Sequence, residues 1–414
     1  MENIFEELKF RELIFQVSNE KELQKKLKED KVTFYIGFDP TAPSLHFGHL
    51  LLIVTMLRFL KFSHKPIALI GEITALIGDP SGKIKERPLL EPLLVQEFSE
   101  KIKAQLEKFL GKEVEILSNR EWLSNLNLVS FLRDYGKHIQ VAQMLSKEAV
   151  KNRISKEGIS FCEFSYMVLQ AIDFLELKKR KNCDLQIGGS DQWGNICLGI
   201  DLVKKVLNVE VFGLTLPLLT LRGKKLGKTE SGAIFLDPKL TSPYQFYQFL
   251  INLDDESSLK FLKWFTFLKK EEILELEKAH KKLPEQRLAQ KTLAKLLTEF
   301  VHGKKELERV EKISNALFYD EIGKLKKEEI EEAFFNVPSE KISIEKEISV
   351  LDLLVLGRVV PSKSEAKRLI NSGAILINDK KVTDIHAKIE KEEALYGKYF
   401  VVKKGKKSYF LIEC

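Results

Sequence analysis

Short apolar segments alternate with longer amphipathic segments through the first half of this 414-residue chain. The apolar segments, which we interpret as buried strands, are Val32–Phe38, Ile67–Ile70, Val114–Leu117 and Leu185–Ile187. The amphipathic segments, which we interpret as helices, include Phe47–Phe62, Leu94–Leu110 and Gly194–Val206. Such alternation predicts a parallel sheet covered by helices on both faces. Because ligands bind these sheets beyond the carboxyl ends of the strands, the site is expected there.

The pattern changes from about Ser242. Residues 242–333 show helical periodicity with few strand signals, which predicts an all-helical domain. Residues 334–347 are mostly polar, contain Pro338 and lack periodicity, which predicts a linker before a compact α+β unit at 348–414. The parallel-sheet domain is expected over residues 1–222, with a mobile loop and connector at 223–241.

Positive charge is concentrated in the last segment. Residues Lys341–Cys414 hold 15 Lys and Arg against 10 Asp and Glu, while the whole chain carries a net charge of +7. Most of the excess charge therefore lies in a small module, as expected for one that contacts phosphates. A solvated lysine-rich surface would give the same count, and charge alone does not separate the two.

Several protein classes are disfavoured by what the sequence lacks. We find no run of about 18 uncharged apolar residues, so no membrane span is predicted. The first twenty residues lack the pattern of a signal peptide. The four cysteines, Cys162, Cys183, Cys197 and Cys414, show no CxxC or CxxH spacing. We therefore expect reduced thiols in the cytoplasm, with no disulfide framework and no zinc or other protein metal site.

One candidate site follows the first predicted strand, in residues 35–49. Ser44 is predicted to cap a helix whose first turn places His46 and His49 on one face. A helix N-terminus attracts phosphate, the imidazoles add donors, and Gly48 leaves room for a flat adenine ring. A weak metal pair or two surface histidines remain alternatives, although no HExxH pattern or nearby cysteine pair would complete a zinc site.

A second candidate is the stretch Lys225-Leu-Gly-Lys-Thr229, which lies in a glycine-containing loop after an apolar run. Two lysines three residues apart can approach a triphosphate and neutralise charge on a leaving pyrophosphate. Alone, such a loop is more often a solvated turn. Together with the upstream histidine pair, it favours a nucleotide site.

These two motifs resemble the HIGH and KMSKS signatures of class I aminoacyl-tRNA synthetases. Within that class the chain resembles the bacterial tyrosyl-tRNA synthetases along essentially its whole length. The matching stretches are Tyr35–His49, Leu76–Arg87, Phe164–Phe174, Leu185–Asn195, Leu226–Asp237 and Thr241–Asn252. Gly227 and Thr229 depart from the general signature in the way that tyrosine enzymes commonly do. The resemblance implies a Rossmann-like α/β catalytic domain, an all-helical anticodon-binding domain and a small α+β S4-type domain.

The resemblance also implies residue roles. For tyrosine, Tyr35 and Asp173 would bracket the phenol hydroxyl, and Gln192 would lie near the reacting carboxylate. The residues expected to hold the α-ammonium group are Asp79, Tyr166 and Gln170. Since Tyr166, Gln170 and Asp173 are spaced i, i+4 and i+7, one helix face presents all three. For ATP, the expected residues are Asp39, His46, Gly48, His49, Gly189, Asp191, Leu226 and Lys228. The catalytic set is Thr41, His46, His49, Lys83, Arg87, Lys225, Lys228 and Thr229, of which Lys83 and Arg87 could instead belong to a mobile basic loop.

The last segment resembles an S4-type RNA-binding module, with two short helices followed by a hairpin. Ser364 is expected to cap the second helix. The predicted RNA-binding residues are Lys363, Lys367, Arg368, Lys380 and Lys381, with Lys403, Lys404, Lys406 and Lys407 extending the basic surface. Asp254 and Asp255 are candidates for anticodon recognition in the helical domain.

The expected reaction is ATP-dependent formation of tyrosyl-adenylate, followed by transfer to the 3′ end of tRNA(Tyr). Mg²⁺ would arrive with ATP and have no dedicated protein site. The resemblance further implies a homodimer, with its contact in the insertion at about residues 123–157, although Met144 and Leu145 there could equally be core. Two alternatives remain: a tryptophan-specific relative and a catalytically silent synthetase-like RNA-binding protein.

Overall fold

The structure is a computed structural model that describes most of the chain. It covers residues 3–81, 88–155, 158–221, 224–225, 232–335, 337–405 and 408–414, without the side chains of residues 148, 149, 221, 224 and 225. The chain divides into two compact units, which are Met1–Thr241 with Leu253–Leu293 and Ser242–Asn252 with Ala294–Cys414. Among the described residues, no helix is long and apolar enough to cross a membrane.

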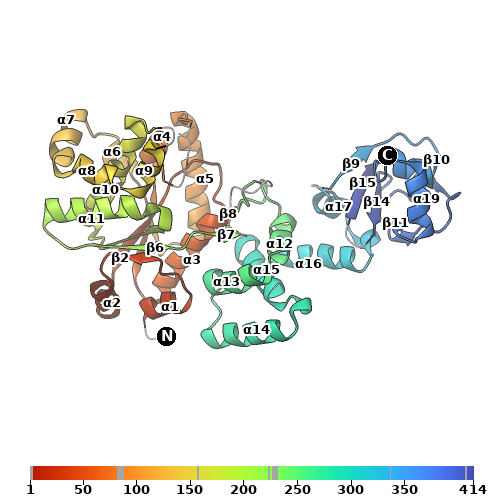
Figure 1. Ribbon diagram of the computed structural model, residues 1–414, viewed down its shortest axis with the longest axis horizontal. Helices are drawn as coiled ribbons and strands as arrows, with labels where there is room; N and C mark the ends of the chain where they lie inside the picture. The colour runs from red at the N-terminus through yellow and green to blue at the C-terminus, as the bar shows by residue number, and fades with distance from the viewer. Residues whose placement is uncertain are drawn as a thin grey trace. The chain divides into compact units, whose positions relative to one another are not determined.

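The first unit is built on a six-stranded sheet of described residues in the order β1-β6-β5-β2-β3-β4, of which Figure 1 labels β2 and β6. Its strands are β1 (Gln16–Val17), β2 (Thr33–Phe38), β3 (Lys65–Ile70), β4 (Glu115–Ser118), β5 (Leu185–Gly189) and β6 (Phe212–Leu216). All neighbours pair in parallel except β1, which runs antiparallel to β6. The central strands are continuous apolar runs because helices cover both faces, which confirms the predicted α/β class.

Helices connect these strands and cover the sheet. They are α1 (Ile4–Phe10), α2 (Glu20–Glu29), α3 (Phe47–Lys61), α4 (Glu72–Ile77), α5 (Pro92–Leu110), α6 (Arg120–Leu123), α7 (Leu128–Ser130), α8 (Val141–Leu145), α9 (Glu148–Ile154), α10 (Phe161–Lys181) and α11 (Trp193–Leu207). The short helical turns are η1 (Phe131–Tyr135), η2 (Gly136–His138), η3 (Ser190–Gln192) and η4 (Pro284–Gln286), and β7 (Thr220–Leu221) pairs with β8 (Lys224–Lys225). The long helices α10 and α11 pack side by side (Figure 1).

Two helices that follow the sheet in sequence, α13 (Asp255–Phe265) and α14 (Lys270–Lys282), also belong to the first unit. Buried Arg11 donates to the carbonyls of Lys263, Thr266 and Leu268 at 2.7, 2.9 and 2.7 Å. Arg58 of α3 is also buried and donates to the Thr266 carbonyl at 2.7 Å. Cations at a helix C-terminus are favourable because its last carbonyls lack partners. These two arginines therefore fix the end of α13 to α1 and α3.

This attachment explains why the units differ from the expected division. The predicted helical domain, residues 242–333, is shared between the two units, since α13 and α14 belong with the sheet. Phe47, the first residue of α3, also packs on Phe265, with ring centroids 4.6 Å apart. The boundary falls within α15 (Leu288–His302).

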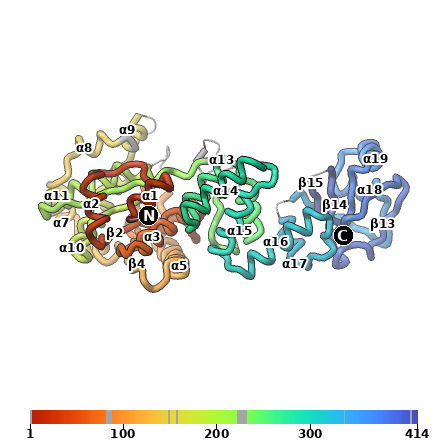
Figure 2. Tube along the Cα trace, turned by 90° about the horizontal axis from the view of Figure 1, so that it is seen from below, coloured from red at the N-terminus to blue at the C-terminus, as the bar shows by residue number. Residues whose placement is uncertain are grey.

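The second unit combines helices with a five-stranded sheet of described residues in the order β12-β11-β14-β15-β9. Figure 2 labels strands β14 and β15 and helices α18 and α19 of this unit. Its helices are α12 (Pro243–Ile251), α16 (Lys304–Phe318), α17 (Lys327–Ala333), α18 (Val350–Leu356) and α19 (Lys363–Asn371), with turns η5 (Ile322–Lys324) and η6 (Lys391–Glu393). Its strands are β9 (Ser339–Lys341), β10 (Glu347–Ser349), β11 (Ile375–Ile377), β12 (Lys380–Lys381), β13 (Lys388–Glu390), β14 (Tyr399–Lys404) and β15 (Ser408–Glu413). Helices α18 and α19 followed by the β11–β12 hairpin match the expected order of the last module.

The structure differs from expectation at the predicted linker. Strand β9 pairs in parallel with β15, and the Ile342 amide donates to the Glu413 carbonyl at 2.8 Å. Ile344 is buried in the core of the C-terminal sheet. Strand β9 consists of Ser, Glu and Lys, and Ile342 and Ile344 follow it, so no alternation of apolar and polar residues marks this strand in the sequence.

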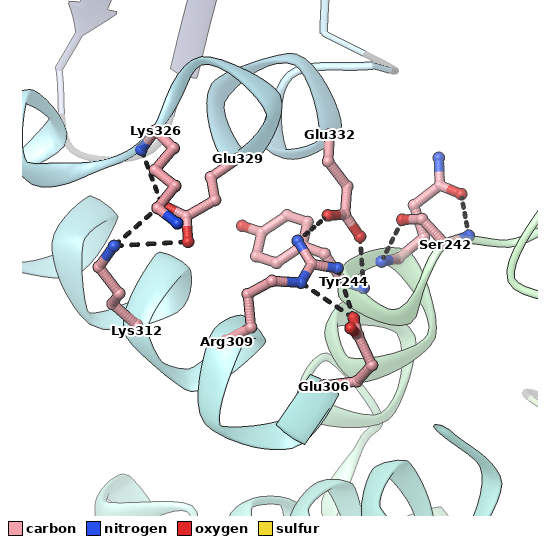
Figure 3. A network of polar contacts seen from close by, with 9 residues as sticks. Ser242, Tyr244, Glu306, Arg309, Lys312, Lys326, Glu329 and Glu332 are labelled. Carbon is pink, nitrogen blue, oxygen red and sulfur yellow. Dashed lines mark hydrogen bonds and ion pairs between the residues drawn. The ribbon is translucent and has the colours of Figure 1, made fainter. Parts of the chain in front are cut away.

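A network of charged side chains connects α12, α16 and α17 in the second unit (Figure 3). Arg309 of α16 donates to Glu306 at 2.7 Å and also pairs with Glu332 of α17. Glu332 in turn accepts from the Tyr244 amide of α12 at 3.1 Å. Burial alone would raise the pKa of Glu332, but the hydrogen bonds from Arg309 and Tyr244 outweigh it and lower the pKa.

We predict that Arg309→Met loosens this junction, because Glu332 is left half-buried without its cation. The expected loss is about 1–2 kcal/mol, measured as faster hydrogen exchange of the α17 amides. The matched control is Lys324→Met, which removes an exposed pair with Glu321 and should leave α17 exchange unchanged. Equal exchange rates in wild type and Arg309→Met would show that the network does not hold α17.

Candidate active site

A cavity of about 430 Å³ opens beyond the carboxyl ends of β2, β3 and β5. Most of the predicted substrate-binding residues line it together: Tyr35, Asp39, Thr41, His46, Gly48, His49, Asp79, Tyr166, Gln170, Asp173, Gly189, Asp191 and Gln192. They come from β2, α3, α10, β5, η3 and the connections between them. The parallel sheet therefore collects into one cavity residues that are far apart in the sequence.

The helix that carries the histidine motif begins with a reciprocal histidine cap. Helix α3 begins at Phe47, and His46 Nδ1 accepts from the Gly48 amide at 3.0 Å. His49 Nδ1 accepts from the His46 amide at 3.2 Å, and the two rings stack 3.8 Å apart. The prediction that Ser44 is the N-cap is therefore wrong, because the N-cap is His46, two residues further along the chain.

This cap determines how the imidazoles face the cavity. Because both Nδ1 atoms accept, each neutral ring carries its proton on Nε2, where it can be donated to a ligand. Burial, and then the neighbouring His46, lower the pKa of His49 well below its ordinary value, so His49 is neutral at pH 7. A Cβ on Gly48 would lie 2.8 Å from His46 Cε1, so glycine is needed for this ring position.

At the opposite end of the cavity, a tyrosine hydroxyl and a carboxylate are buried together. The Tyr35 hydroxyl has no hydrogen-bond partner among the described residues. Asp173 accepts from Trp122 Nε1 at 2.8 Å and from Asn119 Nδ2 at 3.1 Å. Burial raises the pKa of Asp173 to about 8, although these two hydrogen bonds lower it. The pair offers a donor and an acceptor to a buried hydroxyl group.

A third group of polar side chains lies between these ends. The Tyr166 hydroxyl donates to Asp39 at 2.7 Å, and burial together with the nearby Asp39 and Asp79 raises the Tyr166 pKa well above its ordinary value. Asp79 accepts from Gln192 Nε2 at 2.7 Å. The Gln170 side-chain oxygen accepts from Asn195 at 2.9 Å. Two carboxylates and a phenol at this position suit a cationic group.

Some residues in or beside the cavity were missed by the sequence analysis. Thr74, Asn119, Trp122 and Asn195 bond directly to predicted residues, and buried Gln186 lines the cavity. Asn119 directly follows β4, so the rule that sites form at the carboxyl ends of strands would have found it. Trp122 and Thr74 carry no sequence signal, because each looks like an ordinary helical residue.

Other predicted residues lie outside the described part of the chain. These are Lys83, Arg87, Leu226, Lys228, Thr229, Lys406 and Lys407. For Lys225 the structure describes the backbone but not the side chain. None of the described side chains that line the cavity is a lysine or arginine. Within the described residues, no group of three or more His, Cys, Asp or Glu side chains could hold a metal ion.

The chain matches known proteins along its full length. The family described as "tRNA synthetases class I (W and Y)" matches residues 27–319, and the "Tyrosine--tRNA ligase SYY-like C-terminal domain" matches residues 329–412. Tyrosine–tRNA ligase 1 of Bacillus subtilis is 48% identical over 420 residues, covering 100% of this chain and 99% of the relative. The chain belongs to the tyrosyl-tRNA synthetase family.

Two further relatives support this membership. The tyrosine–tRNA ligase of Geobacillus stearothermophilus is 48% identical, covering 99% of each chain. A C-terminally truncated mitochondrial tyrosyl-tRNA synthetase of Aspergillus nidulans superposes with a TM-score of 0.70 at 31% identity, covering 77% of this chain and 95% of that one. These matches do not favour either alternative, the tryptophan-specific relative or the silent RNA-binding protein.

As expected for the S4-type module of a tyrosyl-tRNA synthetase, basic side chains lie on and around α19. Lys367, Arg368 and Lys381 are exposed, whereas Lys363 pairs with Asp352 at 2.6 Å and Lys380 with Glu393 at 3.5 Å. The helix is capped by Ser362, which accepts from the Glu365 amide at 3.3 Å. Ser364 as the cap is therefore wrong, because it lies inside the first turn.

Additional contacts involve the remaining predicted RNA-facing residues. Lys403 pairs with Asp320, and Lys404 lies 3.5 Å from Glu365. Asp254 caps α13 by accepting from the Ser257 amide at 2.8 Å, and Asp255 accepts from Gln290 at 2.6 Å. These carboxylates thus have structural contacts besides any RNA contact.

We predict that Asp173 makes stability fall as the pH rises. Between its ordinary value of 3.8 and about 8, the folded protein keeps a proton that the unfolded chain has lost. The free energy of unfolding should therefore decrease with pH across this window, and Asp173→Asn should flatten the slope, as measured by denaturant unfolding at a series of pH values. The matched control, Asp134→Asn on an exposed turn, should keep the wild-type slope. An unchanged slope in Asp173→Asn would contradict the assigned pKa.

Proposed function

We propose that this chain activates L-tyrosine with ATP and transfers the tyrosyl group to the 3′ end of tRNA(Tyr). Family membership supports the reaction, and the cavity supports how it is performed. The observation that carries the proposal is the shared cavity, which combines the Tyr35–Asp173 pair with the histidine-capped start of α3. One end suits a phenol and the other suits phosphates.

In this proposal, tyrosine binds with its ring toward β2. Its hydroxyl donates to Asp173 and accepts from Tyr35. A phenylalanine in the same position would leave the buried Tyr35 hydroxyl without a partner and would offer no donor to Asp173, which is unfavourable. The ammonium group is held by Asp79, Tyr166 and Gln170, and the Asp79 carboxylate compensates the buried cation. Gln192, bonded to Asp79, lies beside the carboxylate that reacts.

ATP then occupies the part of the cavity near α3. Asp191 and Gly189 hold the ribose, the Asp39 amide contacts the α-phosphate, and Gly48 and Leu226 contact the base. Thr41, His46 and His49 donate to the phosphates, with the helix N-terminus favouring negative charge. The pyrophosphate is stabilised by Lys83, Arg87, Lys225, Lys228 and Thr229. Mg²⁺ enters with the nucleotide as part of the substrate.

The two steps require positioning more than covalent catalysis. The tyrosine carboxylate attacks the α-phosphorus, forming tyrosyl-adenylate and breaking the bond to pyrophosphate. A ribose hydroxyl at the tRNA end then attacks the carbonyl carbon, and AMP leaves. We assign no protein nucleophile, so the rate depends on orientation and on charge placed around the phosphates. The S4-type module binds tRNA through Lys363, Lys367, Arg368, Lys380 and Lys381, and the reaction takes place in the cytoplasm.

The decisive experiment is ATP–pyrophosphate exchange without RNA. With each amino acid at a concentration that just saturates the enzyme with tyrosine, we predict exchange with tyrosine and none above background with phenylalanine or tryptophan, because only tyrosine satisfies both Tyr35 and Asp173. Lys228→Ala should lower the exchange rate about a hundredfold, since it removes charge from the leaving group. The KM for tyrosine should change little, because Lys228 is placed on the pyrophosphate.

The controls separate the alternatives. Lys324→Ala, an exposed lysine of the second unit, should leave exchange unchanged. Exchange with tryptophan in place of tyrosine would favour the tryptophan-specific relative. No exchange with any of the three amino acids would favour the silent RNA-binding protein, and loss of tyrosine binding in Lys228→Ala would contradict the role of the loop.

We further infer that two copies associate through the insertion at about residues 123–157. Large apolar side chains are exposed there, including Leu128 (70%), Val129 (66%), Leu132 (52%) and Val141 (61%). Such a patch is unusual on a monomer and typical of an interface. Met144 is buried, whereas Leu145 is 42% exposed, so only the second is available for contact.

We predict that Val129→Asp combined with Leu132→Asp converts a dimer to monomers, because two carboxylates would be buried at the interface. Sedimentation velocity at micromolar concentration measures the change. The control is Leu283→Asp, at an exposed apolar residue outside the insertion. A wild-type protein that sediments only as a monomer would overturn the proposed interface.

A further inference from the structure

A chain of buried hydrogen bonds runs from the phenol end of the cavity to the phosphate end. Asn119 Nδ2 donates to Asp173 at 3.1 Å and to the Thr74 hydroxyl at 3.1 Å. The Thr74 hydroxyl donates to Asp39 Oδ1 at 3.0 Å, and the Tyr166 hydroxyl donates to Asp39 Oδ2 at 2.7 Å. Asn119 and Thr74 thus bridge the two carboxylates.

The orientation of every group in this bridge is determined. The Asn119 side-chain oxygen accepts from the Ile73 amide at 2.9 Å, so its amino group must point toward Asp173 and Thr74. Since Thr74 accepts from Asn119, its only hydroxyl hydrogen is available for Asp39. Asn119 is 0% and Thr74 2% exposed, so water does not compete for these groups. A buried network in which every group is satisfied is rigid.

The bridge crosses the carboxyl ends of three neighbouring strands. Asp39 directly follows β2, Gly71 directly follows β3, and Asn119 directly follows β4. A Cβ on Gly71 would lie 1.9 Å from Asp39 Oδ1 and 2.4 Å from the Thr74 hydroxyl oxygen. Residue 71, at the end of the middle strand β3, must therefore be glycine for the Asp39–Thr74 hydrogen bond to form.

We infer that Thr74 and Asn119 are positioning residues that couple recognition of the substrate hydroxyl to the chemical step. This inference rests on the proposed function, in which Asp173 binds the phenol and Asp39 places its amide at the α-phosphate. A hydroxyl bound to Asp173 fixes the position of its carboxyl group. The hydrogen bonds from Asn119 to Asp173, from Asn119 to Thr74 and from Thr74 to Asp39 then transmit this constraint to Asp39. An amino acid without the hydroxyl leaves Asp173 with only its two N–H donors, Trp122 and Asn119, and removes the substrate's own contact with the bridge.

The coupling has a kinetic consequence. If Asp173 acted alone, the hydroxyl would contribute to binding, and discrimination against phenylalanine would appear mainly in KM. Through the bridge, the hydroxyl also positions the phosphate end, so part of the discrimination appears in kcat. The residues that set this part of the specificity do not contact the phenol.

The test is Thr74→Val, which keeps the side-chain shape and removes the hydroxyl. In ATP–pyrophosphate exchange, kcat with tyrosine should fall about tenfold, while KM for tyrosine changes less than about threefold. With phenylalanine at high concentration, kcat should change little, so the tyrosine-to-phenylalanine ratio of kcat falls about tenfold. Thr74→Ser, which retains the hydroxyl, should restore the ratio.

The matched control is Thr55→Val, another buried helical threonine, whose hydroxyl donates to the Leu51 carbonyl at 2.8 Å. It should keep the wild-type ratio. An equal fall with both amino acids in Thr74→Val, or a change confined to KM, would overturn the coupling. If Thr74→Val does not fold, Asn119→Ala provides the same comparison of ratios. A wild-type protein without tyrosine-dependent exchange would contradict the proposed function itself.

Discussion

Burial of negative charge is the constraint around which this site is organised. Asp39, Asp79 and Asp173 face one cavity whose described lining contains no lysine or arginine. Carboxylates taken out of water need hydrogen-bond donors or a cation, and otherwise they take up a proton. Asp173 shows this conflict, since burial raises its pKa to about 8 despite two N–H donors. A substrate that brings an ammonium group relieves the charge.

The two ends of the cavity therefore differ in the charge of the ligand groups that they suit. In the proposed function, the end near α10 receives a cation and a hydroxyl. The end near α3 provides neutral His49, the His46 ring and a helix N-terminus for anionic phosphates. The cations expected for the leaving group, Lys83, Arg87, Lys225 and Lys228, lie outside the side chains that the structure describes.

Much of this arrangement could be predicted from sequence, and the failures have physical causes. The strands, the α/β class and the helix face with Tyr166 and Asp173 follow from periodicity, which reports burial directly. The helix cap at His46 was missed because histidine is an unusual cap, and Ser44 fits the common pattern. The strand-end rule identifies the location of Asn119, which directly follows β4, but its partners lie on segments that are distant in sequence. Periodicity carries no information on such contacts.

The choice of neutral bridging groups between Asp39 and Asp173 also follows from the buried charge. A lysine or arginine at Thr74 or Asn119 could pair with both carboxylates and would remove their unfavourable energy permanently. The cavity would then have less need for the substrate ammonium, and its affinity would fall. A hydroxyl and an amide orient Asp39 and Asp173 without adding a permanent positive charge to the cavity. Neutral donors therefore keep the site both rigid and attractive to a cation.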